Sequence, residues 1–518
     1  MKRYLYIAVF ISGMTSMGVE MAASRLLGNV FGTSNLVWAS IIGIILIYLA
    51  AGYFVGGRWA DRSPYFATFY QILIWAGLTT AVIPLASRPV LRVAANAFDQ
   101  LELGVLFGSF TTVLVLLIIP VTLLGTASPF AIRLAIHDPA TAGRISGRIY
   151  AISTLGSFIG TFLPSLVFIP LIGTYRTFLL FGGVLLAFGL VGLWATAGWR
   201  SILKYLWTPV LILALAWLGV RGSDKATPGL VYETESYYNY IQVLEQDGYY
   251  YLRLNEGQGV HSIYNADQLI YNGPWEQVLV APFFNPAPYD PANFNNLAIV
   301  GLAAGTTAHQ ASAVYPDIHI DGYEIDPKIV SVARTYFDMN EPNLDVHVQD
   351  GRWGLEHSPE RYQVISVDAY RPPYIPAHMT TQEFFQIVYD HLTPDGVMVI
   401  NIGRGPNDRR LINALASTIA TVFPSIHVMD IPDTFNSILY ASAQPTDAND
   451  LLRNYAYLSG RSDVHPMLMA VLQRTIVNLQ PAPDLNEQVF TDDLAPVEWI
   501  TNNMVLSFLF SGDMETLQ

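Results

Sequence analysis

Residues 297–326, with the sequence LAIVGLAAGTTAHQASAVYPDIHIDGYEID, indicate the fold of the C-terminal half of this chain. An apolar strand, Leu297–Val300, leads into the glycine-rich turn Gly301–Thr306. A helical segment follows, and a second strand, Ile318–Tyr323, ends at Glu324. Strands that alternate with helical segments predict a parallel, doubly wound sheet. In such a sheet, ligands bind beyond the carboxyl ends of the strands.

The pattern continues in both directions along the chain. Three more strands are predicted downstream, at Leu344–Val348, Tyr362–Val367 and Val397–Ile402. Upstream, Tyr240–Leu244 and Tyr249–Leu254 flank a short turn, which predicts an antiparallel hairpin. We therefore expect a small β-rich subdomain at residues 229–290 and a Rossmann-like, methyltransferase-type α/β domain at residues 291–518.

The residues at the ends of these strands predict a nucleoside site. Gly301 and Gly305 allow a ligand to approach the backbone and the N-terminus of the next helix. Glu324 follows the turn by about 20 residues, where a carboxylate can bind both ribose hydroxyls. Asp350, followed by Gly351, is placed to accept a hydrogen bond from an adenine amine. The alternative is that three of the acids only cap helices: Asp326, Asp350 and Asp368.

The N-terminal part of the chain has the pattern of a membrane protein. Apolar stretches long enough to cross ~30 Å of hydrocarbon lie near residues 4–27, 34–57, 66–87, 103–126, 146–170, 173–197 and 201–220. We expect residues 1–222 to form an α-helical transmembrane bundle of about seven spans. The expected location is a prokaryotic-type inner or plasma membrane, crossed several times.

Charge is divided unequally between the two halves. Residues 1–225 carry 15 Lys/Arg and 6 Asp/Glu, whereas residues 226–518 carry 12 and 35. Basic residues between apolar runs are typical of loops that face an anionic leaflet. The acidic half argues against a nucleic-acid partner, because phosphate would be repelled, and it favours a cationic substrate. The absence of cysteine excludes thiolate chemistry. The histidines form no H-x-x-x-H pair, so no metal site is predicted.

Several short segments carry a resemblance to a known family. They are Glu235–Ile241, Leu252–Gly257, Asp267–Asn272, Glu324–Asp326, Asp350–Gly351, Asp368 and Thr380–Phe385. Together they resemble the spermidine synthases, the polyamine aminopropyltransferases. The whole chain is similar to the membrane-fused members of that family, through the Arg25 region, Gly57–Arg62, Gly147–Gly160 and Thr491–Trp499.

The resemblance implies transfer of an aminopropyl group from decarboxylated S-adenosylmethionine to an amine acceptor. It implies Asp368 as the catalytic general base. The implied substrate-binding residues are Tyr238, Asn239, Asp267, Tyr271, Gly301, Gly305, Glu324, Asp350, Gly351 and Arg371. No tightly bound cofactor is implied, since the adenosyl donor is a co-substrate. The expected partners are small amine and adenosyl molecules and the lipid bilayer, and a homodimer is compatible with the pattern.

The sequence departs from the family on the amine side. Acidic or polar groups of the family are replaced at Asn239, Gln268, Asn272, Ala304 and Arg371. Two alternatives therefore stay open. One is an S-adenosylmethionine-dependent methyltransferase, in which Arg371 would pair with the methionine carboxylate. The other is a non-catalytic nucleoside or polyamine sensor, or a transport-coupled membrane protein.

Two arguments about sidedness disagree. With the N-terminus inside, nine basic residues fall in cytoplasmic segments and six in external segments, which favours that orientation. Seven spans would then place the C-terminal domain outside. A domain that uses adenosyl donors should face the cytosol, where they are made, and we expect the cytosolic side on that ground.

Overall fold

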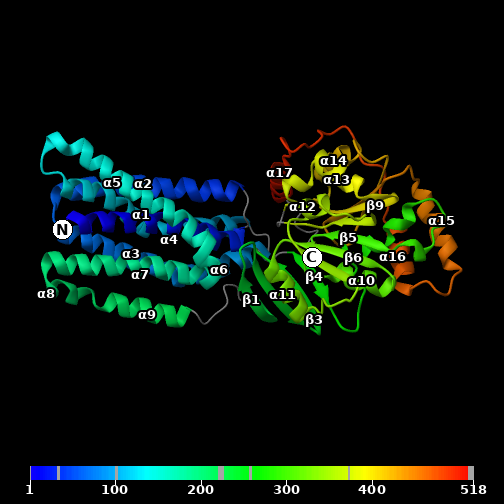
Figure 1. Cartoon of the computed structure of the whole chain (residues 1–518), viewed down its shortest axis with the longest axis horizontal. Helices are drawn as coiled ribbons and strands as arrows, with labels where there is room; N and C mark the ends of the chain where they lie inside the picture. Colours follow the sequence, from blue (N-terminus) through cyan, green and yellow to red (C-terminus); the bar gives the residue numbers. More distant parts are fainter. Residues whose placement is uncertain are drawn as a thin grey trace. The chain divides into compact units, whose positions relative to one another are not determined.

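The computed structural model describes residues 2–31, 35–99, 103–219, 227–255, 259–370 and 374–511 (Figure 1). The chain divides into two compact units. One comprises Met1–Pro228, Glu233–Tyr240 and Asn255–Gln258, and the other comprises Gly229–Tyr232, Ile241–Leu254 and Gly259–Gln518. The three domain ranges drawn from the sequence stay predictions.

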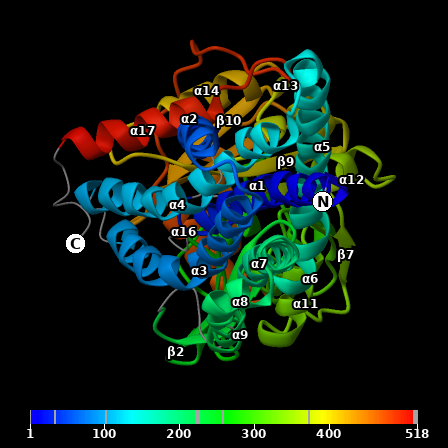
Figure 2. The ribbon, with the colours of Figure 1, turned by 90° about the vertical axis from the view of Figure 1, so that its left-hand side faces the viewer.

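The first unit is a helical bundle. Its α-helices are α1 (Lys2–Phe31), α2 (Asn35–Arg62), α3 (Phe66–Asp99), α4 (Leu103–Ala135), α5 (Ala142–Leu163), α6 (Ile169–Ile172), α7 (Thr174–Ala197), α8 (Trp199–Ile202) and α9 (Trp207–Gly219). Helix α1 contacts α2, α3, α4, α5 and α7, and Figure 2 shows it among them. A Cβ at Gly156 would lie 2.1 Å from the Phe10 carbonyl oxygen, so glycine permits the close contact of α5 with α1.

Six helical stretches among the described residues are long and apolar enough to cross a membrane. They are Tyr4–Gly28, Ile41–Arg62, Phe66–Ser87, Leu116–Ala135, Pro139–Ile172 and Thr174–Ala197. The prediction of a seventh span at 201–220 is wrong for the part that the structure describes, because the chain there is broken into α8, a 3-10 turn and α9. Helix α9 has 13 residues. At 1.5 Å per residue it is about 20 Å long, too short for ~30 Å of hydrocarbon.

A four-stranded sheet begins the C-terminal half. Its strands are β1 (Leu230–Glu235), β2 (Tyr240–Gln246), β3 (Tyr249–Leu254) and β4 (Val260–Tyr264), in the order β1-β2-β3-β4. The predicted hairpin is confirmed as β2 and β3, which pair antiparallel. Its turn residues Asp247 and Gly248 both have positive φ, as a tight hairpin turn requires.

The second unit is built on a seven-stranded sheet. Its strands are β5 (Asn296–Val300), β6 (His319–Glu324), β7 (Leu344–Val348), β8 (Tyr362–Val367), β9 (Leu392–Gly403), β10 (Ser425–Asp430) and β11 (Asn436–Ser442). The order is β10-β11-β9-β8-β5-β6-β7. Strands β5 to β9 pair parallel, and β11 pairs antiparallel with both β9 and β10. The five strands predicted from the sequence are all present, which confirms the Rossmann-like, methyltransferase-type fold.

Helices cover the sheet and make two apolar cores. They are α10 (Thr306–Val314), α11 (Pro327–Tyr336), α12 (Gly351–Glu356), α13 (Gln382–Asp390), α14 (Arg410–Ile419), α15 (Ala448–Ser459), α16 (Pro466–Val477) and α17 (Val497–Ser511). Alternate residues of β5 face opposite cores: Leu297 and Ile299 belong to one, and Ala298 and Val300 to the other. The sheet is therefore buried on both faces, which explains the nearly continuous apolar strands of the sequence.

Candidate active site

The glycine-rich turn after β5 lies directly against the end of β8. Gly301 has a φ of +93°, and a Cβ there would lie 2.5 Å from the backbone oxygen of Asp368. The Asp368 amide also donates to the Val300 carbonyl at 2.9 Å. Gly305, at the start of α10, has a φ of +83°. Glycine is the residue that tolerates both the positive φ and the close approach. The turn and Asp368 are thus side by side.

Glu324 ends β6 and joins two loops. Its Oε2 accepts a hydrogen bond from the Ala303 amide at 3.0 Å, and its Oε1 accepts one from the Asp326 amide at 2.9 Å. Burial raises the pKa of Glu324 to about 7, although the two amides favour the charged form. Each carboxylate oxygen can accept a second hydrogen bond. The carboxylate therefore has the capacity that two ribose hydroxyls would need.

Asp350 follows β7 and makes two kinds of contact. Its Oδ1 accepts from the Trp353 amide at 3.0 Å, so the predicted helix cap is confirmed, as it is for Asp326 on α11. Its Oδ2 lies 3.2 Å from Nε2 of His378. The hydrogen bond with His378 lowers the pKa of Asp350. A Cβ at Gly351 would lie 2.5 Å from the Val300 side chain, so this position also requires glycine.

Asp368 follows β8, and no helix starts directly after it among the residues that the structure describes. Its Oδ1 accepts a hydrogen bond from Nδ2 of Asn401 at 3.0 Å. Asn401 lies on β9, and its backbone oxygen accepts from the Tyr370 hydroxyl at 3.0 Å. Loss of solvent raises the pKa of Asp368 to about 6, and the hydrogen bond from Asn401 opposes that shift. A carboxylate that titrates near neutral pH is suited to accept a proton from a substrate.

A cavity of 470 Å³ opens beside the Asp350–His378 pair. Its lining residues are Arg352, Ala377, His378, Thr381, Asp492 and Ala495. The Arg352 guanidinium donates two hydrogen bonds of 2.7 Å to the Asp492 carboxylate and a third, of 2.8 Å, to the His378 carbonyl. The Thr381 hydroxyl donates to Asp492 at 2.7 Å. The segment Thr491–Trp499 thus returns to the candidate site across a long stretch of sequence.

The loop after β4 holds two of the implied substrate-binding residues, Asp267 and Tyr271. The Tyr271 hydroxyl donates to the Gln268 carbonyl at 2.8 Å and accepts from the Asn265 amide at 3.1 Å. Burial raises the pKa of Tyr271 to about 12. Asp267 is exposed, and its backbone amide donates to the Asn265 side chain at 2.8 Å. Both hydrogen bonds of the Tyr271 hydroxyl are therefore made within its own loop.

Tyr238 and Asn239 belong to the first unit, in the turn between β1 and β2. Tyr238 is exposed, and the Asn239 side-chain oxygen accepts from Asn255 at 2.9 Å. The Arg25 guanidinium donates to the carbonyl oxygens of Ser236 at 2.8 Å and of Tyr238 at 3.3 Å. Arg25 thus holds the turn that carries Tyr238. Arg371 lies outside the described residues.

The strand order fixes how the remaining residues are arranged. Neighbouring strands β8, β5, β6 and β7 place Asp368, Gly301, Glu324 and Asp350 in that order along one edge of the sheet. With strands about 4.8 Å apart, the row is about 14 Å long. An extended nucleoside could lie along it with its reacting end at Asp368. Three carboxylates in one row favour a cationic ligand.

Three side chains at this edge are not apparent from the strand pattern. Asn401 is in the middle of an apolar strand, and its polar side chain there is a signal that a buried partner exists. Arg352 and Asp492 pair across 140 residues of sequence, and no local pattern connects them. For Asp492, the resemblance of Thr491–Trp499 to the membrane-fused members of the family is the sequence signal that points to a functional role.

Known proteins share this domain. Residues 291–450 match the family model described as the spermine/spermidine synthase domain. A probable polyamine aminopropyl transferase of Bifidobacterium longum is 36% identical over 285 residues, which cover 52% of this chain and 61% of the relative. A polyamine aminopropyltransferase of Vibrio vulnificus is 25% identical over 298 residues, covering 55% of this chain and 96% of the relative.

A methyltransferase is also among the relatives. The human eEF1A lysine and N-terminal methyltransferase is 30% identical over 163 residues, which cover 29% of this chain and 23% of that protein. Both kinds of relative fit a Rossmann-like sheet, and the family model matches the part that carries Gly301, Glu324, Asp350 and Asp368. The C-terminal half of this chain is thus similar to the spermine/spermidine synthases.

Proposed function

We propose that the protein transfers an aminopropyl group from decarboxylated S-adenosylmethionine to an amine acceptor. The neutral acceptor nitrogen attacks the aminopropyl carbon that is bonded to sulfur. A carbon–nitrogen bond forms, the carbon–sulfur bond breaks, and its electron pair converts the sulfonium into a neutral thioether on the adenosyl product. The acceptor nitrogen loses one proton, which Asp368 takes.

The observation that carries this proposal is the environment of Asp368. Its carboxylate is oriented by Asn401 and has a pKa raised to about 6, and its backbone contacts the Gly301 turn. A base in this state is largely ionised at neutral pH and can still be reprotonated. Such a base is needed because an ammonium acceptor has no free electron pair for the attack.

Donor binding is assigned to the same edge. Glu324 would take the ribose hydroxyls, and Asp350 the adenine amine. The three carboxylates of the row would attract the sulfonium and the terminal ammonium of the decarboxylated donor. The Ala304 side chain is buried where the family carries an acid for that ammonium. The remaining acids would therefore bind the donor less tightly than in relatives that keep it.

The experiment is a product assay with the purified full chain in detergent. Putrescine and spermidine are offered as acceptors with either decarboxylated or ordinary S-adenosylmethionine, and the acceptor is analysed by mass spectrometry. Addition of an aminopropyl group that depends on the decarboxylated donor supports the proposal. Absence of any aminopropyl product with both acceptors and their analogues would overturn it.

A methyltransferase is the second candidate. The loss of an acidic side chain at Ala304 and the similarity to a methyltransferase favour it. Ordinary S-adenosylmethionine carries a carboxylate beside its amine, and an acid at position 304 would repel that carboxylate. Transfer of a methyl group in the same assay would select this function. Binding of either nucleoside without any product would favour the non-catalytic sensor.

We also propose that the helical unit is inserted in a membrane and that the C-terminal domain faces the cytosol. Six spans return the chain to the side on which it starts. With the N-terminus inside, Arg221 and Lys225 then join the inner segments, so that eleven basic residues fall inside and four outside. This agrees with the positive-inside rule more strongly than seven spans would. It also removes the conflict between charge and substrate location.

Paired cysteine labelling tests the number of spans. The chain has no cysteine, so Asp138→Cys and Glu360→Cys each introduce a single exposed thiol. Ser358 is less suitable, since it is partly buried and hydrogen-bonds to Tyr362. With six spans, both thiols react with an impermeant maleimide only after lysis. If one thiol reacts in intact cells and the other does not, an odd number of spans separates residues 138 and 360, and the assignment fails.

A further inference from the structure

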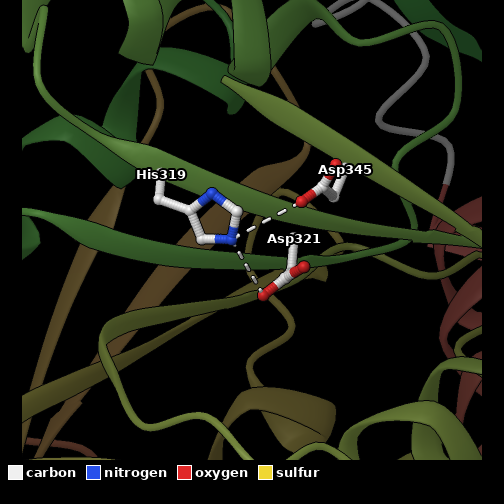
Figure 3. A group of neighbouring side chains, drawn as sticks. All are labelled: His319, Asp321 and Asp345. Carbon is white, nitrogen blue, oxygen red and sulfur yellow. Dashed lines mark ion pairs between the residues drawn. The ribbon is translucent and has the colours of Figure 1, made fainter. Parts of the chain in front are cut away.

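A second cluster of chemically active side chains lies at the opposite ends of two strands from the candidate active site. His319 and Asp321 are two residues apart on β6, and Asp345 lies on β7. Asp321 and Asp345 are direct neighbours in the parallel register. Residues two apart on a strand point to the same face. Figure 3 shows the three side chains converging from the two strands.

The distances suit a divalent metal ion. The His319 Nε2 lies 3.6 Å from an Asp321 oxygen and 3.9 Å from an Asp345 oxygen. The three ligand atoms all lie within 4.8 Å of one another. A tetrahedral ion with bonds of about 2.1 Å separates its ligand atoms by roughly 3.4 Å, so small side-chain shifts would bring all three into coordination.

Neighbouring groups hold Asp321 in place. Asp321 is buried, its Oδ1 lies 2.7 Å from Nε2 of His347, and its Oδ2 accepts from the Tyr362 hydroxyl at 2.9 Å. Groups that hydrogen-bond to a ligating carboxylate orient it and strengthen metal binding. His347 is on β7, two residues after Asp345 and opposite Tyr323 in the register, and its side chain reaches Asp321 diagonally across the two strands.

Charge at this place also favours a cation. Two carboxylates that face each other on neighbouring strands repel, which destabilises the pairing of those strands. Strand β7 is at the edge of the sheet and pairs only with β6 among the described strands. A divalent ion bound between Asp321 and Asp345 would neutralise the repulsion and fasten β7 to β6.

We propose that His319, Asp321 and Asp345 form a site for a divalent transition metal ion such as Zn²⁺, with water in the fourth position. Their imidazole nitrogen and carboxylate oxygens are ligands that Zn²⁺ accepts. The site lies three to five residues before Glu324 on the same strand, which is about 10–17 Å at 3.3 Å per residue. The ion therefore fastens the sheet edge and takes no part in transfer at Asp368.

The test uses the full chain in detergent, stripped with a chelator and titrated with Zn²⁺ by calorimetry. One ion per chain is expected to bind, and Asp345→Asn and His319→Ala should each weaken that binding by at least tenfold. Both side chains are substantially exposed, at 71% and 44%, so the variants should fold. His347→Ala should weaken binding by about 10-fold through Asp321.

Matched controls remove similar groups elsewhere on the second unit. Asp317→Asn takes an exposed carboxylate close in sequence, and His357→Ala takes an exposed imidazole from α12's end. Both should bind Zn²⁺ like the parent chain. Co²⁺ should give visible absorption bands of a tetrahedral site that Asp345→Asn abolishes. Failure of the parent chain to bind, or equal loss in the controls, would overturn the proposal.

Discussion

The nucleoside side and the amine side of the candidate active site differ in how the chain uses its polar groups. On the nucleoside side, Gly301, Glu324 and Asp350 all lie at neighbouring strand ends, and each is fixed by contacts with the backbone or with a neighbouring loop. On the amine side, Tyr271 closes its own loop. The acid that the family places at position 304 is an alanine.

The two halves of such a site are therefore under separate constraints. The nucleoside side is part of the sheet, because the same carboxylates and glycines that would bind a ligand also join the loops. The amine side consists of loop side chains that can change without disturbing the sheet. A chain with this sheet can therefore keep the proposed donor site while the residues of the proposed acceptor side change.

The largest effect is expected at the border between the two sides. Asp368→Asn keeps the shape and removes the base, so turnover should fall by about 10²–10⁴ while donor affinity is nearly unchanged. Turnover is followed as aminopropyl product, and affinity by calorimetry. Asp317→Asn, which changes an exposed carboxylate before the N-terminal end of β6, is the control. Equal loss of affinity and turnover would mean that Asp368 binds the donor.

A second variant tests the nucleoside side alone. Glu324→Gln replaces one acceptor oxygen by a donor and should weaken binding of adenosyl ligands by at least tenfold, since charge-assisted hydrogen bonds contribute about 2–4 kcal/mol in total. Calorimetry with the decarboxylated donor and with its thioether product measures this. Parental affinity for both ligands would place the nucleoside elsewhere in the molecule.

The pH dependence of turnover tests Asp368, provided that the donor is kept saturating, because burial raises the pKa of Glu324 to about 7 and this group titrates over the same interval. Asp368 is raised to a pKa of about 6, so it is protonated below that value and cannot accept the proton of the acceptor. Turnover with saturating donor should therefore fall by about tenfold between pH 7 and pH 5. A rate that stays constant over this interval would remove Asp368 from the proton transfer.

The smallest effect is expected at the cavity beside Asp350. Asp492→Asn removes one of the two charge-assisted hydrogen bonds that Asp492 accepts from Arg352. Because the Asp492 side chain is nearly half exposed, we expect the free energy of unfolding to fall by only about 1–2 kcal/mol. The KM for the donor should rise by a few fold, with kcat unchanged, because the pair positions the His378 backbone. Thermal unfolding and steady-state kinetics measure the two effects. A fall in kcat alone would assign Asp492 a direct part in the reaction.

The strand ends could be predicted from the sequence because the fold itself requires them. Five strands of the large sheet and the residues after four of them follow from apolar runs that end in glycine or an acid. The strands β10 and β11 were not predicted, although β10 also ends in an acid, Asp430. The seventh span was predicted from apolarity alone, which does not detect the break between α8 and α9.

Contacts between distant segments could not be predicted. The pair of Arg352 with Asp492 depends on a segment that folds back on the sheet, and the hydrogen bond of Asn401 with Asp368 depends on the register of β9 against β8. The cluster of His319, Asp321 and Asp345 has a spacing of two that is typical of strands, whereas the H-x-x-x-H pattern is a helical one. The proposed metal site could therefore be recognised only from the register of β6 against β7.

The preference of the protein for one of two adenosyl donors separates aminopropyl transfer from methyl transfer. The two candidate donors differ by one carboxylate, and the aminopropyltransferase proposal requires the protein to prefer the donor without it. Calorimetry of the full chain should show that decarboxylated S-adenosylmethionine binds more tightly than S-adenosylmethionine, and that Glu324→Gln weakens both. Equal or tighter binding of S-adenosylmethionine would contradict aminopropyl transfer and favour the methyltransferase.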